Sequence, residues 1–380
     1  DSFKAYADGN KIVYASDCDS TKDKYAVKVS LADSDGTAVG TEQTNAAGSF
    51  DNLEVGKYKI TATLSDGTTE KKKVEKTINI KNLDDMSAYL FVHFVDTQED
   101  ATREQIYFSV SKDGKTWTTL NNKQPYLTSN VGTQGVRDPY ILRGEDGKFF
   151  IIATDLSVYN LKNNWTAAAQ QGSKSIVVWE SSDLVNWSEA SLVKINNDNA
   201  GCTWAPEACY DPEKDEYMVF WASVVSDDSY QKYRIYRSYT KDFKTFSAPE
   251  LYIEEPNAVI DTTIIDHEGT YYRFTKNEAK SSITMQECTS LSGDWKDVAN
   301  YNLGSMTGYE GPTIYKLNGK NEWCLLLDYF SKSKGYKPFV TTDITKGEFT
   351  ADSDFSFDGT YRHGTVMPIT QAEYESLTAE

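Results

Sequence analysis

The sequence predicts an all-β protein, in which a five-bladed β-propeller follows a small N-terminal β-sandwich of immunoglobulin type. Three observations support this fold class. The first 85 of the 380 residues contain short alternating runs and no Trp. The rest of the chain repeats a strand, turn and aromatic segment five times, and five apolar hairpins interleave with those repeats. We therefore expect a sandwich at residues 1–85 and a propeller at residues 86–380.

The N-terminal region alternates apolar and polar residues with period two, as in AVKVSLAD (26–33) and KYKITATLSDG (57–67). Asp-Gly and Gly-Lys turns separate such runs, a pattern typical of antiparallel strands. The segment KNLDDMS (81–87) is the expected linker. Carbohydrate-binding modules commonly use exposed Trp platforms, and this region has no Trp. We expect it to be a spacer or structural domain that covers part of the propeller.

The repeated segment joins a strand to a Ser/Thr-rich acidic turn and then to an aromatic residue. Its five copies are YFSVSKDGKTWTTL (107–120), VVWESSDLVNWSEA (177–190), IYRSYTKDFKTFSAP (235–249), MQECTSLSGDWKDV (285–298) and FVTTDITKGEFTAD (339–352). Repeating units of roughly 40–50 residues that hold a few short strands indicate propeller blades.

The interleaved hairpins are expected to supply the innermost strand of each blade. They open with DPYIL (138), APEAC (205), DTTII (261), EGPTIY (310) and HGTVMPI (363). Innermost strands line the axis of a propeller, so each hairpin brings one polar group to the same end of the channel. Those groups are Asp138, Glu207, Asp261, Glu310 and His363. The apolar run AYLFVHFVD (88–96) is expected to pair with the last of these strands and close the ring.

Charge and composition exclude several classes of function. The chain has 57 acidic and 39 basic residues, a net charge of −18, which disfavours nucleic acids and anionic membrane surfaces. No apolar stretch approaches the roughly 20 residues of a spanning helix. No signal peptide or initiator Met is visible, so we expect a processed or trimmed chain. The five cysteines show no CxxC spacing and are expected to be free buried thiols, with no disulfide framework or zinc site.

Carboxylates at the mouth of a propeller point to acid/base chemistry on an uncharged substrate. Glycoside hydrolysis needs one carboxyl group as acid and another that stays ionised as base. A third carboxylate nearby raises the pKa of the acid by repulsion between like charges. Asp138, Asp261 and Glu310 lie on three different predicted blades and are the candidates for this arrangement.

Five motifs in order resemble glycoside hydrolase family 43. They are RDPYIL (137–142), WAPEA (204–208), IDTTI (260–264), YEGPTIY (309–315) and YRHGTVMPI (361–369). That family consists of five-bladed propellers that act with inversion as arabinofuranosidases, xylosidases and arabinanases. The resemblance covers residues 88–375 and leaves the N-terminal region unexplained.

The resemblance implies a role for each matching residue. Asp138 would be the general base that activates water, Glu310 the general acid, and Asp261 the group that orients the acid and tunes its pKa. His363 would lie near a hydrated calcium ion in the channel and contact it through water, since Ca²⁺ prefers oxygen ligands. No organic cofactor is expected. Inversion would place base and acid roughly 6.5–9.5 Å apart.

Five further residues are candidate substrate contacts, each with a structural alternative. Trp204 is expected either to stack on a sugar or to pack in the core. Glu207 competes with Glu310 as the acid, although the family pattern leaves it at most a substrate contact. Asp155 would contact a sugar hydroxyl or cap its loop. Arg273 and Arg362 would donate to sugar oxygens or pair with the axial carboxylates.

Two other propeller hydrolases fit the sequence less well. SKDGKTW (111–117) resembles the Asp-box of sialidases, but those enzymes have six blades and an arginine triad for an acidic sugar. Fructan hydrolases share Arg-Asp-Pro and Glu-Cys motifs. Here, however, Glu287-Cys288 falls in an outer repeat segment, and the early Asn-Asp-Pro-Asn segment is absent.

The function expected is therefore an inverting, exo-acting α-L-arabinofuranosidase. Its partners would be plant hemicellulose or pectin, such as arabinoxylan, arabinan or xylo-oligosaccharides. A polymer substrate implies an extracellular or cell-surface location. The polar insert at 157–174 would wall one side of the channel and favour exo action. A β-D-xylosidase or endo-arabinanase is the alternative within the family, and a glycan-binding propeller is the alternative without catalysis.

Overall fold

The computed structural model describes residues 2–18, 25–81, 86–95 and 100–379. Within these ranges the chain is built of 27 strands, with two α-helices and five short 3-10 turns, so the all-β class is confirmed. The helices are α1 (Trp165–Gln170) and α2 (Gln371–Thr378). The turns are η1 (Ala101–Arg103), η2 (Asn121–Lys123), η3 (Ser226–Asp228), η4 (Phe330–Lys332) and η5 (Ile344–Lys346).

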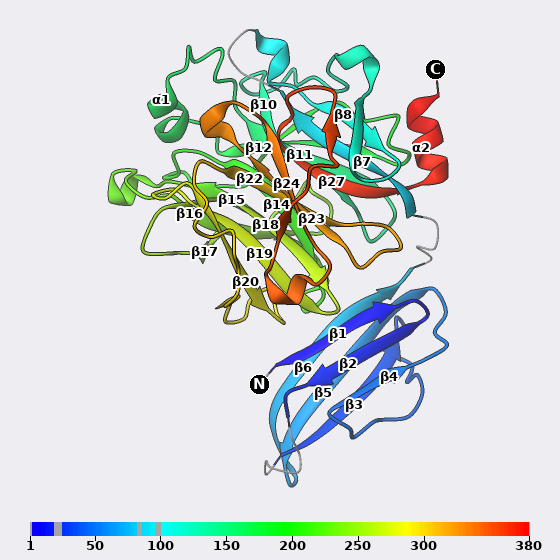
Figure 1. Cartoon of the computed structure of the whole chain (residues 1–380). Coiled ribbons are helices and arrows are strands. Elements are labelled where there is room, and N and C mark those ends of the chain that lie inside the picture. The colour runs from blue at the N-terminus through cyan, green and yellow to red at the C-terminus, as the bar shows by residue number, and fades with distance from the viewer. Residues whose placement is uncertain (1, 19–24, 82–85, 96–99, 380) are drawn as a thin grey trace.

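The first six strands form two three-stranded antiparallel sheets, which appear in blue in Figure 1 beside the larger body. One sheet holds β1 (Phe3–Asp8), β2 (Lys11–Ser16) and β4 (Ala47–Phe50), and the other β3 (Ala26–Asp33), β5 (Gly56–Asp66) and β6 (Thr69–Ile80). Apolar residues from both sheets share one core, which contains Ile12, Val29 and Ile60. Alternate residues of β3 are buried, as the period-two pattern predicts. The expected boundary near residue 85 lies outside the described residues.

Five larger sheets contain the described residues from 86 onward. Four of them are consecutive four-stranded antiparallel sheets: β10 (Val136–Arg143), β11 (Phe149–Asp155), β12 (Ser175–Ser181), β13 (Ser191–Lys194); β14 (Trp204–Asp211), β15 (Glu216–Ser223), β16 (Arg234–Thr240), β17 (Glu250–Ile253); β18 (Val259–His267), β19 (Thr270–Asn277), β20 (Ser282–Cys288), β21 (Lys296–Asp297); and β22 (Glu310–Lys316), β23 (Trp323–Asp328), β24 (Tyr336–Thr341), β25 (Thr350–Ala351). Each expected hairpin supplies the first two strands of its sheet.

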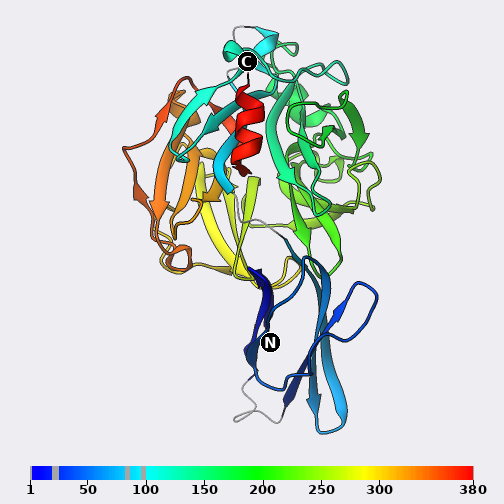
Figure 2. The same cartoon turned by 90° about the vertical axis from the view of Figure 1, so that its right-hand side faces the viewer.

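The fifth large sheet joins the beginning of this region to the end of the chain. Its order is β26 (Ser356–Phe357), β9 (Thr116–Thr119), β8 (Tyr107–Ser111), β7 (Met86–Phe94) and β27 (Arg362–Thr370). β27 pairs with β7 in antiparallel register, for example Val366 with Phe91, which confirms the expected pairing of 88–96 with the last hairpin strand. Figure 2 shows β7 and α2 next to each other at this junction.

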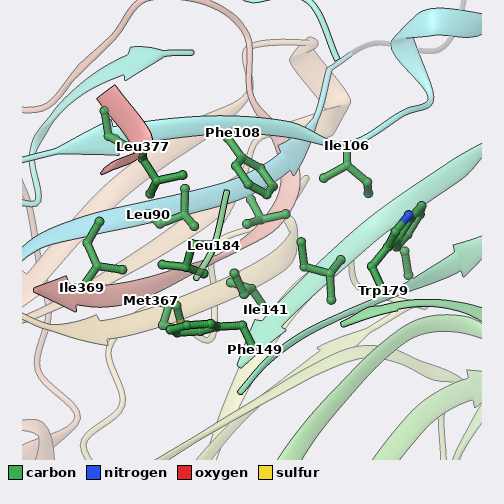
Figure 3. Close-up of a cluster of buried hydrophobic side chains, with 14 of the residues drawn as sticks. Leu90, Ile106, Phe108, Ile141, Phe149, Trp179, Leu184, Met367, Ile369 and Leu377 are labelled. Atoms are coloured by element: carbon green, nitrogen blue, oxygen red, sulfur yellow. The ribbon is translucent and has the colours of Figure 1, made fainter. Parts of the chain in front are cut away.

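The first strand of each of the four consecutive sheets and β27 of the fifth sheet are neighbours in space, and these five strands are called the first strands below. β10 contacts β14, β14 contacts β18, β18 contacts β22, β22 contacts β27, and β27 contacts β10. Hydrophobic clusters fill the spaces between adjacent sheets. Figure 3 shows one of them, where Leu90 and Phe108 pack with Ile141, Trp179 and Leu377.

The same irregularity interrupts each first strand near its start. A β-bulge shifts the register between Arg137 and Tyr140, Trp204 and Glu207, Ile260 and Thr262, Glu310 and Thr313, and Arg362 and Thr365. The bulged residue has positive φ in four of these strands: Asp138 (49°), Ala205 (47°), Asp261 (51°) and Gly311 (51°). A bulge re-aims the side chain that it carries.

The N-terminal sheets touch the larger body through polar contacts. Lys57 pairs with Asp215 at 2.7 Å, Lys81 pairs with Glu145 at 2.7 Å, and the backbone N–H of Thr77 donates to the carbonyl of Pro212 at 2.6 Å. In the described ranges no helix is long and apolar enough to span a membrane. Among the described residues no cysteine forms a disulfide, and Cys202 and Cys324 are buried.

Candidate active site

A pocket of about 520 Å³ opens over the ring of first strands. Four of the five bulged strands, β10, β18, β22 and β27, contribute to its polar lining with Arg137, Asp138, Asp261, Glu310, Arg362 and His363. Three of the candidate catalytic residues therefore lie in one pocket, although they are up to 172 positions apart in the sequence. The shared bulge contributes to the convergence, because Asp138 and Asp261 are the bulged residues of their strands and Glu310 directly precedes the bulged Gly311.

Asp138 is held as a carboxylate by its contacts. Thr154 donates its hydroxyl to Oδ2 at 2.9 Å, and Nδ1 of His363 lies 3.3 Å from Oδ1. Burial alone would raise the pKa of Asp138, but the hydrogen bond and the charge of His363 hold that pKa below its usual value. Asp138 is therefore a carboxylate at neutral pH, the form that a general base would need.

Asp261 occupies the equivalent bulge position on β18. Its Oδ2 accepts a hydrogen bond from the N–H of Gly311 at 3.0 Å, and its Oδ1 lies 3.9 Å from Nδ1 of His363. Burial raises the pKa of Asp261 to about 6, against the opposing effect of His363, and Glu310 adds to the rise. The hydrogen bond ties Asp261 to the residue that follows Glu310, so Asp261 orients the β22 bulge directly.

Glu310 stands at the mouth of the pocket with 22% of its side chain exposed. Lys276 Nζ donates to Oε2 at 3.0 Å, and Arg362 Nη2 lies 3.4 Å from Oε1. The next residue, Gly311, explains the Glu-Gly-Pro motif. A Cβ there would lie 2.7 Å from His363 Cγ, and φ is positive, so only glycine fits beside the imidazole.

His363 lies between Asp138 and Asp261 and is only 5% exposed. Burial lowers the pKa of a histidine, but the carboxylates of Asp261 and Asp138 outweigh it and raise the pKa of His363 to about 10. The ring is therefore an imidazolium at neutral pH, a fixed positive charge beneath the pocket.

Glu207 lies deeper than the sequence order indicates. Glu207 follows the bulge of β14, whereas Glu310 precedes the bulge of β22. Glu207 is 3% exposed and does not line the pocket. Within the part of the chain that the structure describes, its Oε2 has no hydrogen-bond partner. Burial raises the pKa of Glu207 to about 8. A direct contact between Glu207 and a substrate in this pocket is not supported.

The other expected contacts divide between the pocket and the scaffold. Trp204 lines the pocket, and Arg362 both lines it and pairs with axial carboxylates, donating to Asp328 at 2.7 Å. Asp155 accepts hydrogen bonds from the backbone and hydroxyl of Thr133 at 2.7 and 2.9 Å, so it caps a loop. Arg273 lies elsewhere, with its Nε donating to Gln286 at 2.8 Å, and it is absent from the pocket.

The sequence analysis missed several pocket residues, among them Trp165, Tyr233, Lys276 and Phe330. Trp165 packs edge-on against Trp204, which stacks on Tyr233 with ring centroids 5.3 Å apart. Lys276 is 2% exposed and lies 4.5 Å from the Phe330 ring centroid. The only available signal was for Trp165, which belongs to the insert at 157–174 that was expected to wall the channel.

The residues around His363 do not fit a directly bound calcium ion. Calcium takes six to eight oxygen ligands. In the part of the chain that the structure describes, no group of three or more His, Cys, Asp or Glu side chains is spaced to hold a metal. The imidazolium form of His363 also has no lone pair to donate. Calcium contacted through water stays a prediction, and no step below uses it.

Paired carboxylates in different protonation environments, set in a polar pocket with an aromatic wall, define the class of acid/base glycoside hydrolases. The comparisons with known proteins agree. Residues 84–375 match the family of probable glycosyl hydrolase domains related to family 43. The chain belongs to this family of glycoside hydrolases, and the resemblance seen in the five motifs is confirmed.

A curated relative is an α-L-arabinofuranosidase of Bifidobacterium longum subsp. longum, 30% identical over 385 aligned residues. The match covers 88% of this chain but only 35% of the relative, so the chain spans about a third of that protein.

Two solved structures are also similar to the chain. A thermostable family-43 glycoside hydrolase has 19% identity and a TM-score of 0.42, over 60% of this chain and 75% of its own. The catalytic domain of a Coprinopsis cinerea family-62 α-L-arabinofuranosidase has 16% identity and a TM-score of 0.44, over 60% of this chain and 71% of its own.

Proposed function

We propose that the chain is an inverting, exo-acting α-L-arabinofuranosidase that removes side groups from plant hemicellulose or pectin oligosaccharides. The observation that best supports this proposal is the composition of the pocket. The ionised Asp138 and the accessible Glu310 both line it, and Asp261 accepts a hydrogen bond from the residue after Glu310. The named activity of the Bifidobacterium relative supports arabinose as the sugar.

In this proposal Asp138 takes a proton from the attacking water, and Glu310 gives one to the departing oxygen. The oxygen of the water bonds to the anomeric carbon as the glycosidic bond breaks on the opposite face. His363 keeps Asp138 ionised, and Asp261 fixes the β22 bulge. Trp204 and Trp165 would pack against the sugar, and Arg362 would contact its oxygens or hold Glu310.

The fold that we propose is a five-bladed propeller at 86–380 after a β-sandwich at 1–85. The ring of contacts among β10, β14, β18, β22 and β27 supports five blades. The pairing of β27 with β7 supports a ring closed by the two ends of the region. A polysaccharide substrate would place the protein outside the cell or on its surface, with calcium reached through water in the channel.

Product analysis by NMR tests the reaction. An inverting enzyme acting on an α-L-arabinofuranoside releases β-L-arabinose first, and an exo enzyme releases only the monosaccharide. Release of xylose would support the β-D-xylosidase alternative, and release of oligosaccharides from arabinan an endo-arabinanase. If no pentoside is cleaved while the chain still binds glycans, the chain is a glycan-binding propeller.

Two substitutions test the assigned roles. Asp138→Asn is expected to reduce turnover about 10²–10⁴-fold on every substrate. Glu310→Gln is expected to cause a similar loss on oligosaccharides but to spare aryl glycosides, whose leaving groups need no proton. Equal loss on all substrates would contradict the acid role. Glu287→Gln is the control, and its turnover should not change because Glu287 lies on β20, outside the pocket. The same variant tests the fructan-hydrolase alternative, in which Glu287 would be the acid.

A further inference from the structure

A second cavity, of about 320 Å³, lies at the junction of two neighbouring sheets. Strands β16 and β17 of one sheet and β19 and β20 of the next contribute to its walls, in the region at the lower left of Figure 1. It shares no lining residue with the axial pocket. Its volume falls in the usual range of ligand pockets, roughly 300–1,000 Å³.

Two arginines from different sheets meet in this cavity over one aromatic ring. The guanidinium carbons of Arg237 and Arg273 lie 4.8 and 5.7 Å from the ring centroid of Tyr252. Arg273 also lies 4.3 Å from the ring of Trp295 and is only 6% exposed. Burial lowers the pKa of Arg273, which shows that the charge is held in a costly environment. Two like charges brought together in this way need a compensating anion.

The protein itself compensates these charges poorly. The carboxylate nearest to Arg237 is that of Glu250, at 3.7 Å and half exposed, and in the described residues no carboxylate forms an ion pair with Arg273. Glu254, on the rim, is already paired with Lys232 and Arg234. The hydrogen bonds of the two guanidinium groups go to neutral atoms: Arg237 Nη1 to Ser292 Oγ and Met218 Sδ, and Arg273 Nε to Gln286 Oε1. The carboxylate of Glu255 acts on Arg273 without a close ion pair.

Three buried polar atoms in the same cluster have no hydrogen-bond partner among the described residues. They are Nε of Arg237, Nε1 of Trp295 and the hydroxyl oxygen of Tyr252. A buried donor left without an acceptor costs about 1–3 kcal/mol. Arginine, tyrosine and tryptophan are also the residues that most often anchor ligands and partners. The cluster is thus costly for folding and well suited to recognition.

We propose that this Arg237–Arg273 cavity binds a uronate, a sugar that carries a carboxylate, at a site separate from the axial pocket. A carboxylate matches the planar donor arrangement of guanidinium groups. The rim residues Glu255 and Asp294 are acceptors for the hydroxyls of the sugar ring. The same two carboxylates would repel a bare anion, so the hydroxyls of a sugar are part of the specificity.

The experiment compares D-galacturonate with D-galactose, which differ only at C6, and extends to their trimers. Binding to the whole chain is measured by calorimetry and by saturation-transfer NMR at about 0.15 M salt. Trigalacturonate should bind with a Kd below about 1 mM and at least tenfold more tightly than galactotriose. The Glu310→Gln variant should bind it equally well, since the cavity lies outside the catalytic pocket.

Substitutions locate the site. Arg237→Gln and Arg273→Gln should each weaken trigalacturonate binding at least tenfold. Arg143→Gln, which removes an arginine paired with Glu373 elsewhere, should not. Arg237 is partly exposed, so its variant keeps the test valid if Arg273→Gln unfolds. The proposal fails if galactotriose binds as tightly, if inorganic phosphate competes as strongly as the uronate, if Arg237→Gln binds normally, or if nothing binds.

Discussion

Four bulged residues show how single backbone positions prepare the site. Asp138, Ala205, Asp261 and Gly311 share a φ near +50°, which costs a residue with a side chain about 1–3 kcal/mol. Only two of the four carry a carboxylate. Because Ala205 adopts the same conformation without one, the bulge belongs to the architecture, and the chemistry uses it by placing an acidic residue there.

Lys276 acts on the same pocket from the second strand of its sheet. Its ammonium lies 3.0 Å from Oε2 of Glu310 and 2.8 Å from Oε2 of Glu278. Lys276→Met removes the ammonium that holds Oε2 of Glu310, and the methionine side chain keeps the contact with Phe330. A carboxyl group that is no longer held in place should protonate the leaving oxygen less well, so kcat/KM on oligosaccharides should fall about tenfold.

Steady-state kinetics of the wild type and of Lys276→Met, measured on an oligosaccharide and on an aryl glycoside, check this expectation. Only the oligosaccharide needs the acid, so only its kcat/KM should fall. An unchanged kcat/KM on the oligosaccharide, together with an unchanged melting temperature, would show that Lys276 does not position Glu310.

Glu207 makes the stability of the fold depend on pH. Its pKa is raised by burial to about 8, so the folded protein holds a proton there that the unfolded chain releases near pH 4.5. The folded state binds more protons in this window, and its stability falls as pH rises from about 4.5 to 8. Glu207→Gln has no charge to bury, so it should be about 1–3 kcal/mol more stable than the wild type at pH 8.5 and close to it at pH 4.5.

Urea unfolding at several pH values measures this difference. Glu287→Gln, on a half-buried residue of β20, is the matched control. A Glu207→Gln variant that is less stable than the wild type at pH 8.5 would show that the carboxylate is paired in solution, contrary to the unsatisfied Oε2.

At the scale of elements, the insert at 157–174 builds one wall of the pocket. Its helix α1 starts with Trp165, and Asn164 caps the helix by accepting a hydrogen bond from the N–H of Ala167. The fully buried Glu104 accepts hydrogen bonds from the N–H groups of Val158 and Tyr159, which pins the start of the insert. Glu104 also pairs with Arg137, whose guanidinium carbon lies 5.3 Å from the Trp165 ring centroid.

Trp165→Ala should raise KM about tenfold and change kcat little, because in the proposed complex the ring would contact the sugar without contacting the reacting atoms. Steady-state kinetics on arabino-oligosaccharides test this expectation. Tyr159→Ala removes a similarly exposed aromatic residue of the same insert that does not line the pocket, and it should leave KM unchanged. If the two variants have the same KM, the insert is not a binding wall.

The sequence predicted which residues form strands better than it predicted which side chains reach the pocket, and the reason is physical. Alternation and repeats revealed the hairpin strands and the pairing of β7 with β27. The opening motifs aligned Glu207 with Glu310, but these residues stand on opposite sides of their bulges, and only one reaches the pocket. Arg273 and Lys276 are three residues apart on β19, so they face opposite sides of the sheet. No local pattern indicates which side meets the axis.

At the scale of the whole molecule, a polar interface joins the N-terminal sheets to the larger body. Its central residue is Lys76, 2% exposed, which donates to the carbonyl oxygen of Thr289 at 2.7 Å and pairs with Glu213 at 3.4 Å. Lys57 with Asp215 and Lys81 with Glu145 lie around it and are more exposed. Exposed pairs contribute little, so Lys76 should carry most of the specific docking energy.

Lys76→Met removes the buried donor and leaves Glu213 and the Thr289 carbonyl without their partner, which should cost about 1–3 kcal/mol. We expect the N-terminal sheets to melt as a separate, earlier transition in calorimetry, while arabinofuranoside hydrolysis at 25 °C stays unchanged, since no pocket residue precedes Arg137. Lys59→Ala, an exposed lysine on β5, should melt like the wild type. Loss of hydrolysis in Lys76→Met would show that the docked sheets shape the pocket, and an unchanged single transition would show that apolar contacts hold the two parts together.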